Sequence, residues 1–427
     1  MILLYRILTL IIYPFLVLFT FIRIYLKKED PKRFREKIFY NCFNVKEKNK
    51  SKLIWLHAAS LGELRSMLPI IESLNLNNSN LNFLVTTTTL SSANLAKIEF
   101  NNLSNVEHRF FPYDVDFLIS KFLNLWKPDY IFLIDSEIWP NLMLKAKKLG
   151  IPIALVNARL TLKTYKRWML FPNTAKKIFE LFDLCICSNI ETKTFLEKLE
   201  VKNVYFFGNL KLINQVNEKK IFNVNEKLLS NKRFWFAAST HKGEDLFCIK
   251  THLELKRKFN DVITIIAPRH IERSFKIKLL SEKYKLNSQI LNKHEKILEG
   301  KELIIINHFG VLQNYFKHVK SVFIGKSMIK KLKHDGGQDP VEAAKLNCKI
   351  YHGPYVYNFK EIYEILEKNN ISKLVNSFEE LSIQLINDLE RPYKQKNGSS
   401  IFINELGQKT LIDTMNSINN FLSNESK

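Results

Sequence analysis

A chain of 427 residues with 46% hydrophobic residues is long enough for two or three domains and apolar enough to form packed cores. Its 65 Lys and Arg residues outnumber its 42 Asp and Glu residues, which gives a formal net charge of +23 and an isoelectric point of about 9.6. This excess predicts an anionic partner, although a genomic bias toward Lys, Asn, Ile and Phe would produce part of it. The sequence holds no zinc finger, RNA-binding signature or array of basic helices, so we expect acidic lipid headgroups or a phosphorylated substrate rather than nucleic acid.

The first 26 residues are almost wholly apolar and predict an uncleaved membrane anchor. Their uninterrupted part, 7–22, would form a helix of about 24 Å, shorter than the ~30 Å hydrocarbon core, which Arg6 and Arg23 could extend by snorkelling. The alternative, a cleaved signal peptide, is disfavoured because no small-x-small site precedes the basic residues at 27–35. We expect the anchor to span the membrane or to embed in one leaflet, with the rest of the chain on the cytoplasmic side.

Residues 52–74 predict a strand, a tight turn and a helix. The apolar run 53–56 is typical of a buried strand, the turn 58–62 is rich in small residues, and the apolar spacing that follows is that of one helix face. Glu63 therefore falls in the first turn of a helix at the carboxyl end of a strand, where ligands bind in open α/β sheets. The helix N-terminus would keep this carboxylate ionised, which suits a general base. The alternative is that Glu63 only caps the helix.

Strand-like and helix-like segments alternate along the rest of the chain. The further predicted strands are 81–87, 130–135, 152–156, 184–187, 204–207, 234–238, 262–267, 303–306, 322–324 and 349–351. This alternation predicts βαβ units and parallel sheets. It supports two doubly wound, Rossmann-like α/β domains, and we further expect these to face each other across a cleft in the two-domain glycosyltransferase architecture called GT-B.

The polar segment 214–232 has the composition of a linker and sets the expected domain boundaries. These are an anchor helix at 1–26, a first α/β domain at 27–213, the linker at 214–232, and a second α/β domain at 233–427, whose last helix could return to the first domain. The five cysteines, at 42, 185, 187, 248 and 348, lack metal-ligand spacing. We therefore predict no metal site, buried inert thiols and a reducing compartment.

Polar residues follow most of the predicted strands at the edge where ligands bind. In the first half they are Glu63, Ser136, Glu137, Asn157, Arg159 and Lys211, and in the second half they are Ser239, His241, Arg269, His270 and the loop 325–342. Each has a common structural explanation: Glu137 could cap a helix, Lys211 could be solvated, and Arg269 could pair with a surface carboxylate. Their repetition at the same topological position predicts a functional site instead.

The segment 336–342 is the strongest phosphate-binding candidate. Gly336 and Gly337 would permit close backbone approach, and Pro340 fits the first position of a helix whose free N–H groups bind an anion. Glu342, in the first turn, could accept hydrogen bonds from ribose hydroxyls. Asp339 argues against phosphate, because a charged cap competes for the same donors, and a loop with a helix cap is the alternative.

Eight motifs in order along the chain resemble the 3-deoxy-D-manno-octulosonic acid (Kdo) transferases of lipopolysaccharide synthesis. They are WLHAASLGE (55–63), SEIWPNLM (136–143), NARLT (157–161), GNLK (208–211), AASTHKGE (237–244), APRH (267–270), GGQDPVEAA (336–344) and HGPYVYNF (352–359). The resemblance implies a membrane-associated GT-B enzyme of the cell inner membrane, acting on the cytoplasmic face. It implies CMP-Kdo as donor substrate, a lipid A precursor (lipid IVA) as acceptor, and no cofactor.

The resemblance also assigns roles to residues by position. Glu63 matches the catalytic base, and Glu137 and Lys211 match the residues that stabilise the transition state. The residues that match the CMP site are Pro268, Arg269, Phe309, Gly310, Val311, Asp339, Pro340, Val341 and Glu342. The chain departs from the family in having Phe-Gly-Val at 309–311 in place of Met-Gly-Glu, Asp339 in place of Asn, and extra residues around 330–333.

We expect from this resemblance a metal-independent, inverting transfer. Glu63 would deprotonate a sugar hydroxyl of the acceptor, and CMP would leave from the opposite face of Kdo. A CMP-sugar has a single phosphate and no Asp-x-Asp motif stands at a strand end, so no bridging metal is expected. Two alternatives remain: another GT-B enzyme that uses a UDP-sugar, and a non-catalytic membrane-anchored relative.

Overall fold

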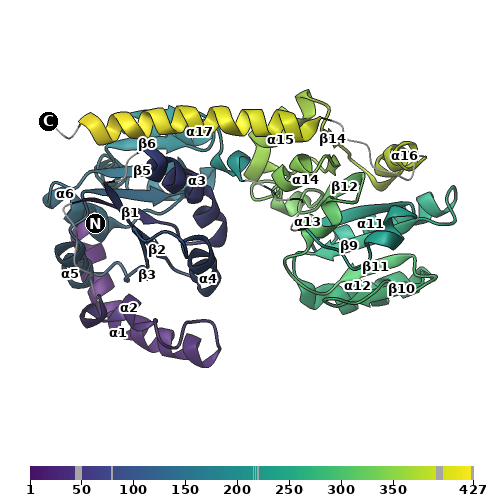
Figure 1. The fold of residues 1–427 in the computed structure, drawn as a ribbon, viewed down its shortest axis with the longest axis horizontal. Coiled ribbons are helices and arrows are strands. Elements are labelled where there is room, and N and C mark those ends of the chain that lie inside the picture. The colour runs from purple at the N-terminus through teal and green to yellow at the C-terminus, as the bar shows by residue number, and fades with distance from the viewer. Residues whose placement is uncertain are drawn as a thin grey trace. The chain divides into compact units, whose positions relative to one another are not determined.

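The computed structural model describes residues 1–43, 51–77, 80–214, 216, 218, 221–390 and 398–424. The chain forms two compact units, Met1–Asn214 with Gly407–Lys427, and Gln215–Leu406 (Figure 1). Each unit contains one parallel sheet flanked by helices. The last helix, α17 (Ser399–Asn424), begins in the second unit and ends in the first.

The first unit is built on a seven-stranded sheet in the order β3-β2-β1-β4-β5-β6-β7. Its elements are α1 (Ile2–Tyr25), α2 (Arg35–Ile38), η1 (Tyr40–Cys42), β1 (Lys52–His57), α3 (Leu61–Asn77), β2 (Leu81–Thr87), α4 (Leu90–Glu99), β3 (Val106–Phe110), α5 (Asp116–Trp126), β4 (Tyr130–Ile134), α6 (Pro140–Lys148), β5 (Ile153–Ala158), α7 (Leu162–Trp168), α8 (Pro172–Phe179), β6 (Leu184–Cys187), α9 (Ile190–Lys198), β7 (Val204–Phe206) and η2 (Leu210–Ile213). Residues 53–57 of β1 are all buried because helices cover both faces of the sheet. Helices α5, α6 and α8 pack on one face, and α3 with α17 packs on the other.

The second unit is built on a seven-stranded sheet in the order β10-β11-β9-β8-β12-β13-β14. Its elements are α10 (Glu226–Ser230), β8 (Phe234–Thr240), α11 (Glu244–Lys256), β9 (Ile263–Pro268), η4 (Ile271–Arg273), α12 (Ser274–Lys283), β10 (Ser288–Leu291), β11 (Leu303–Ile306), α13 (Leu312–Phe316), β12 (Ser321–Ile324), η5 (Lys330–Leu332), α14 (Val341–Lys345), β13 (Lys349–His352), η6 (Tyr357–Phe359), α15 (Lys360–Lys368), β14 (Ser372–Leu374) and α16 (Phe378–Leu389). Both sheets are doubly wound, so the expected fold class of two Rossmann-like α/β domains is confirmed.

The segment predicted to be a linker, 214–232, is packed against the second unit in its second half. Ile221 and Leu229 are buried, and Asn225 accepts a hydrogen bond from the Ile297 N–H at 2.8 Å. Asn223 donates to the Asn314 carbonyl at 3.0 Å. These asparagines are polar but buried with backbone partners, so polar composition does not mark exposed chain here. Residues 215, 217, 219 and 220 lie outside the described residues.

Helix α1 is longer than the apolar segment 7–22 predicted, because it continues through Pro14 and extends beyond both arginines. Its 24 residues span about 36 Å, and it is long and apolar enough to cross a membrane. One side of the helix contacts the first unit: Tyr5 donates to Asp114 at 2.9 Å, Tyr13 donates to the Ile38 carbonyl at 2.5 Å, and Thr20 hydrogen-bonds Tyr113 at 2.8 Å. These contacts hold α1 along the surface of the unit.

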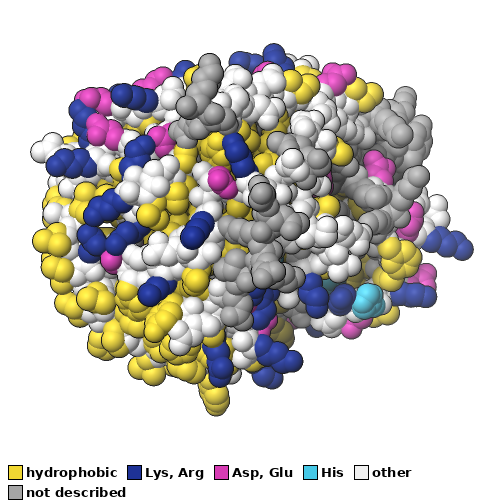
Figure 2. Space-filling view, turned by 60° about the vertical axis from the view of Figure 1, so that its left-hand side comes forward, with side chains coloured by type: hydrophobic (Ala, Val, Ile, Leu, Met, Phe, Trp, Pro, Cys, Tyr) yellow, Lys and Arg dark blue, Asp and Glu magenta, His cyan; other side chains and the backbone are white. Residues whose placement is uncertain are grey.

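The rest of α1 presents large apolar side chains to solvent. They include Leu3, Leu4, Ile7, Leu8, Ile11, Phe15, Leu18, Phe19 and Ile22. Figure 2 shows hydrophobic side chains gathered on this side of the molecule, with Lys and Arg side chains beside them. An exposed apolar surface of this size marks an interaction site.

Candidate active site

The carboxyl ends of β1, β4 and β5 bring the predicted acidic residues of the first unit to one sheet edge. These strands are adjacent, and Glu63 lies in the first turn of α3 directly after β1. The Glu63 carboxylate accepts hydrogen bonds from the Ala59 N–H at 2.7 Å and from the Ser60 hydroxyl at 2.7 Å. Glu63 is thus fixed against the turn 58–62 that the sequence predicted.

Burial raises the pKa of Glu63 above its ordinary value. The Ser60 hydrogen bond opposes this shift, and the nearby charges of Glu137 and Asp135 add to it. The sequence predicted that the helix N-terminus keeps this carboxylate ionised. Desolvation by burial opposes ionisation and is the largest cause of the raised pKa. A carboxylate with a raised pKa is a stronger base, so the environment suits proton abstraction.

Glu137 is oriented by two ring nitrogens that meet the same carboxylate oxygen. Trp139 Nε1 donates to Glu137 Oε2 at 2.7 Å, and His57 Nε2 lies 3.2 Å from that oxygen. A carboxylate only accepts, so His57 Nε2 must carry the hydrogen. Among the described residues, both of these contacts are made at Oε2 of Glu137.

His57 is itself held by the buried core. Its ring is fully buried, stacks on Phe111 at 3.9 Å between centroids, and places Nδ1 2.9 Å from the Thr86 hydroxyl. Trp55 Nε1 donates to the same hydroxyl at 2.9 Å. Sequence reasoning named Glu137 but missed His57, although it stands inside the first motif.

Residues with left-handed backbone conformation stand at the carboxyl ends of β4 and β5. They turn the chain there and place polar side chains at the carboxyl edge of the sheet. Asp135 has φ 66° and Asn157 has φ 54°, and β5 shifts register between Val156 and Ala158. The Asn157 side chain accepts from the Leu210 N–H at 3.0 Å, which places the turn η2 and its Lys211 beside β5. Non-glycine residues in this conformation store strain of about 1 kcal/mol each and are concentrated at functional sites.

In the second unit a buried carboxylate joins two loops at the carboxyl edge. Glu244 is fully buried, and its carboxylate accepts from the N–H groups of residues 241, 326, 327 and 328 at distances of 2.8 to 3.0 Å. Gly325 cannot be replaced without a clash, since a Cβ would lie 2.7 Å from the Ser239 carbonyl oxygen. The loops after β8 and β12 are therefore locked together.

Arg269 and His270 are exposed directly after β9, beside these loops. The Arg269 N–H donates to the Thr240 carbonyl at 3.0 Å, and His270 lies against the His241 ring at 5.8 Å. Burial lowers the pKa of His241, and Lys326, His270 and Arg273 lower it further, against a hydrogen bond to the Ser239 carbonyl. The edge is thus rich in cationic side chains, which suits an anionic ligand.

The other predicted donor-site residues lie between β11 and α13 and at the start of α14. Phe309 is exposed and Gly310 has φ 81°, whereas Val311 is buried as the N-cap of α13. Glu342 accepts a hydrogen bond from Gln313 Nε2 at 3.0 Å. Residues 312–316 and 341–345 thus adjoin, which brings the 309–311 and 339–342 segments into one neighbourhood.

Two expectations for the segment 336–342 were wrong. Pro340 is the N-cap of α14, not its first residue, and the Val341 N–H is taken by Asp339 Oδ1 at 3.0 Å. Gly336 packs against the backbone of Tyr355 and not against open space for a ligand, because a Cβ at Gly336 would lie 2.1 Å from the Tyr355 carbonyl oxygen. The paired glycines therefore pack against residues of the 352–359 motif.

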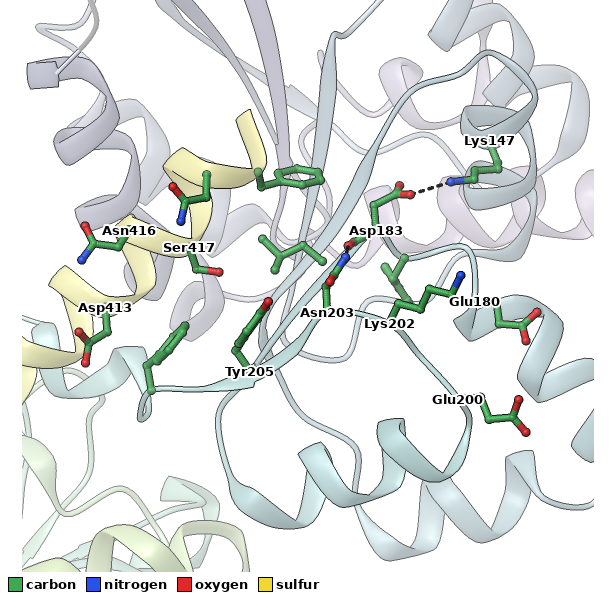
Figure 3. Close-up of a pocket in the computed structure, with 15 residues that line it drawn as sticks. Lys147, Glu180, Asp183, Glu200, Lys202, Asn203, Tyr205, Asp413, Asn416 and Ser417 are labelled. Atoms are coloured by element: carbon green, nitrogen blue, oxygen red, sulfur yellow. Dashed lines mark hydrogen bonds and ion pairs between the residues drawn. The ribbon is translucent and has the colours of Figure 1, made fainter. Parts of the chain in front are cut away.

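A cavity of about 910 Å³ in the first unit lies away from these residues. It is lined by residues at the amino ends of β6 and β7 and by α17 (Figure 3). Lys147 pairs there with Asp183 at 2.7 Å. Glu63, in contrast, follows the carboxyl end of β1. None of the predicted site residues lines this cavity, so volume alone does not locate the candidate site.

The fold and the two sheet edges define a GT-B-type protein. Solved structures with this fold include Anabaena HepE in complex with UDP, at TM-score 0.57 and 12% identity over 87% of this chain and 100% of that chain. A putative UDP-N-acetylglucosamine 2-epimerase of Listeria monocytogenes matches at TM-score 0.54 and 12% identity, over 88% and 98% of the two chains.

Sequence comparison identifies the family. The family model described as 3-deoxy-D-manno-octulosonic-acid transferase (kdotransferase) matches residues 32–214. A protein of Arabidopsis thaliana named "probable 3-deoxy-D-manno-octulosonic acid transferase, mitochondrial" is 30% identical, over 74% of this chain and 72% of its own. The 3-deoxy-D-manno-octulosonic acid transferase of Rickettsia bellii is 28% identical over 98% and 99% of the two chains. The chain belongs to the Kdo transferase family.

Proposed function

We propose that the protein transfers Kdo from CMP-Kdo to a lipid A precursor, lipid IVA, by an inverting and metal-independent reaction. The supporting observation is the carboxyl edge of the first unit, where Glu63 has a raised pKa and stands among oriented polar groups. Membership of the Kdo transferase family supports Kdo as the transferred sugar.

In the proposed step Glu63 takes a proton from a sugar hydroxyl of the acceptor. The resulting oxygen forms a bond to the anomeric carbon of Kdo while the bond from that carbon to the CMP phosphate oxygen breaks. Glu137 Oε1 and Lys211 stabilise the charge that develops at the reacting sugar. The buried His57 keeps Glu137 from turning away during this step.

The leaving CMP is proposed to be held by the second unit. Arg269 offers its guanidinium to the phosphate, and Glu342, held by Gln313, accepts the ribose hydroxyls. Pro268, the backbone of 309–311 and residues 339–341 complete the proposed nucleotide site. Val311 is buried at the place of the family's Glu, so this chain would bind CMP without that carboxylate.

Membrane association is proposed through α1, on the cytoplasmic face of the inner membrane. Its inner side is fastened to the first unit along four turns, from Tyr5 to Thr20, and its outer side is apolar. These contacts favour a helix embedded in one leaflet over one that spans the bilayer alone. The basic residues after α1 and the net charge of +23 would then face anionic headgroups.

The test is a reconstituted reaction with labelled CMP-Kdo and lipid IVA, with thermal shifts by CMP and UDP measured alongside. We expect a labelled glycolipid and a larger stabilisation by CMP. Stabilisation by UDP alone would point to a UDP-sugar enzyme. Stabilisation by CMP without product would point to a non-catalytic relative.

A further inference from the structure

A run of large apolar side chains is exposed at the turn between α7 and α8. Met169, Leu170 and Phe171 are 39%, 72% and 49% exposed. Single exposed apolar residues are normal, but adjoining ones indicate a contact surface. Trp168, directly before these residues, packs its ring edge-on against Phe179 of α8, with 5.2 Å between the ring centroids. We call residues 169–171 the apolar tip.

The apolar tip is surrounded by positive charge. Residues 157–179 contain six Lys and Arg residues and no Asp or Glu. Lys163, Lys166 and Arg167 on α7 and Lys177 on α8 are exposed. An apolar tip with a cationic collar matches an anionic lipid surface, which offers acyl chains beneath negative headgroups. A nucleic acid would use the cations but not the apolar tip.

The apolar tip is fixed to the edge that carries the proposed catalytic residues. Helix α7 starts directly after Arg159 at the carboxyl end of β5, and Thr161 caps it by accepting from the Thr164 N–H at 3.2 Å. Tyr165 stacks on Phe195 of α9 at 4.2 Å with an interplanar angle of 5°. The apolar tip is therefore presented by a supported helix at that edge.

The apolar tip also belongs to the layer on which α1 lies. Helix α8 contacts α6, and Asn141 of α6 donates to Thr9 of α1 at 3.2 Å. Two apolar features thus share one side of the first unit, with α6 between them.

We propose that residues 163–171 form a second membrane contact, in which Leu170 and Phe171 insert among anionic lipid headgroups beside the catalytic edge. This contact would hold the lipid acceptor's headgroup near Glu63, and in this respect it rests on the proposed function. Membrane insertion itself is measured without donor or acceptor, so its failure is distinguishable from failure of the transferase proposal.

The first test places an environment-sensitive nitrobenzoxadiazole label at Leu170→Cys in full-length protein with Cys42→Ser, since the other native cysteines are buried. Phosphatidylcholine vesicles are compared with vesicles that also contain phosphatidylglycerol. We expect a blue shift of the emission on the anionic vesicles, no shift for a label at Ile98→Cys on the opposite face of the sheet, and loss of the shift in K166E/R167E. An unmoved label at 170 on vesicle-bound protein would overturn the proposal and favour a protein partner for the apolar tip.

The second test measures partitioning of unlabelled protein onto the same anionic vesicles. L170S/F171S should lower the partition coefficient about tenfold, because two apolar side chains are lost from the membrane. The matched control L76S/I98S removes two exposed apolar side chains on the opposite face and should leave it unchanged. The thermal unfolding temperature in detergent should be equal in both variants, which shows that each is folded. Equal partitioning of the two variants would contradict the proposal.

Discussion

The two units of the chain use the same sheet edge in different ways. Both place a register shift and a left-handed residue at the end of a central strand, at Asn157 on β5 and at Ser239 on β8. In the first unit, Glu63 and Glu137 are held in place by neighbouring donors at this edge. In the second unit, Glu244 turns inward onto backbone N–H groups, and Arg269 is exposed. Under the proposed function, the first edge moves a proton and the second holds the anionic phosphate.

The comparison is tested most strongly by removing the proposed base. Glu63→Gln keeps an acceptor for the Ser60 hydroxyl but cannot take a proton, so turnover should fall roughly 10²–10⁴-fold. In the wild type, turnover should fall as the pH drops through the raised pKa of Glu63, because the base must be ionised. The pH profile of the initial rate checks this, and an acid limb that survives in Glu63→Gln would assign it to another group.

The same raised pKa has a consequence for stability. A group whose pKa is higher in the folded state stabilises that state at low pH, and the contribution is lost as the pH rises through the folded pKa. At neutral pH the ionised Glu63 therefore costs stability. Glu63→Gln should melt at the same temperature as the wild type or higher at pH 7, whereas a lower melting temperature would show that the carboxylate is chiefly structural.

In the second unit the buried carboxylate should matter for folding. Glu244→Ala leaves several N–H groups buried without acceptors, and we expect a loss of about 4 kcal/mol or more in the free energy of unfolding. Urea unfolding measures this loss. Glu254→Ala, on the exposed side of the same helix, is the matched control and should change stability by less than about 0.5 kcal/mol. An equal loss of unfolding free energy in Glu244→Ala and Glu254→Ala would show that the buried carboxylate has no special role in stability.

A smaller effect is expected from the residue that orients Glu137. His57→Leu removes the donor at Nε2 and should lower turnover roughly ten- to a hundredfold, since a hydrogen bond to a carboxylate contributes about 1.5–3 kcal/mol. His57→Gln can place an amide N–H near the same oxygen and should restore part of this loss. A purely structural role would lower the melting temperature of both variants and leave the turnover of the folded fraction unchanged.

The smallest of these effects concerns the attachment of α1. Burial raises the pKa of Asp114 to about 6, and its carboxylate accepts from the Asn141 and Leu142 N–H groups and from Tyr5. Asp114→Ala should lower the free energy of unfolding by about 1–2 kcal/mol, as for loss of a helix cap. Thermal unfolding in detergent measures it. Tyr5→Phe, which loses only the hydroxyl, should cost less, and the reverse order would argue against the capping role.

The sequence predicted the central strands and missed only strands at sheet edges. β1, β2 and β9 are long apolar runs because both faces are covered. β3, β10 and β14 are edge strands, and β3, with the sequence VEHRF, has only Phe110 buried. Exposed edges need no apolar pattern, so their residues resemble loops.

The candidate site was predictable by position but not by contact. Strand ends marked Glu63, Glu137 and Arg269, because parallel strands deliver their carboxyl ends to one edge. The pairing of His57 with Glu137 joins residues 80 apart in the sequence, and that of Glu244 with Ser327 joins residues 83 apart. Such contacts depend on packing, and no local sequence pattern records them.

The central claim is that the first unit carries the catalytic base and the second unit binds CMP. It is tested most directly by calorimetric titration of CMP into two variants, Glu63→Gln and Arg269→Ala. The account predicts wild-type affinity for Glu63→Gln and an affinity about tenfold or more weaker for Arg269→Ala, because the proposed phosphate contact comes from Arg269 and not from Glu63. Loss of CMP binding in Glu63→Gln, or full binding in Arg269→Ala, would contradict it.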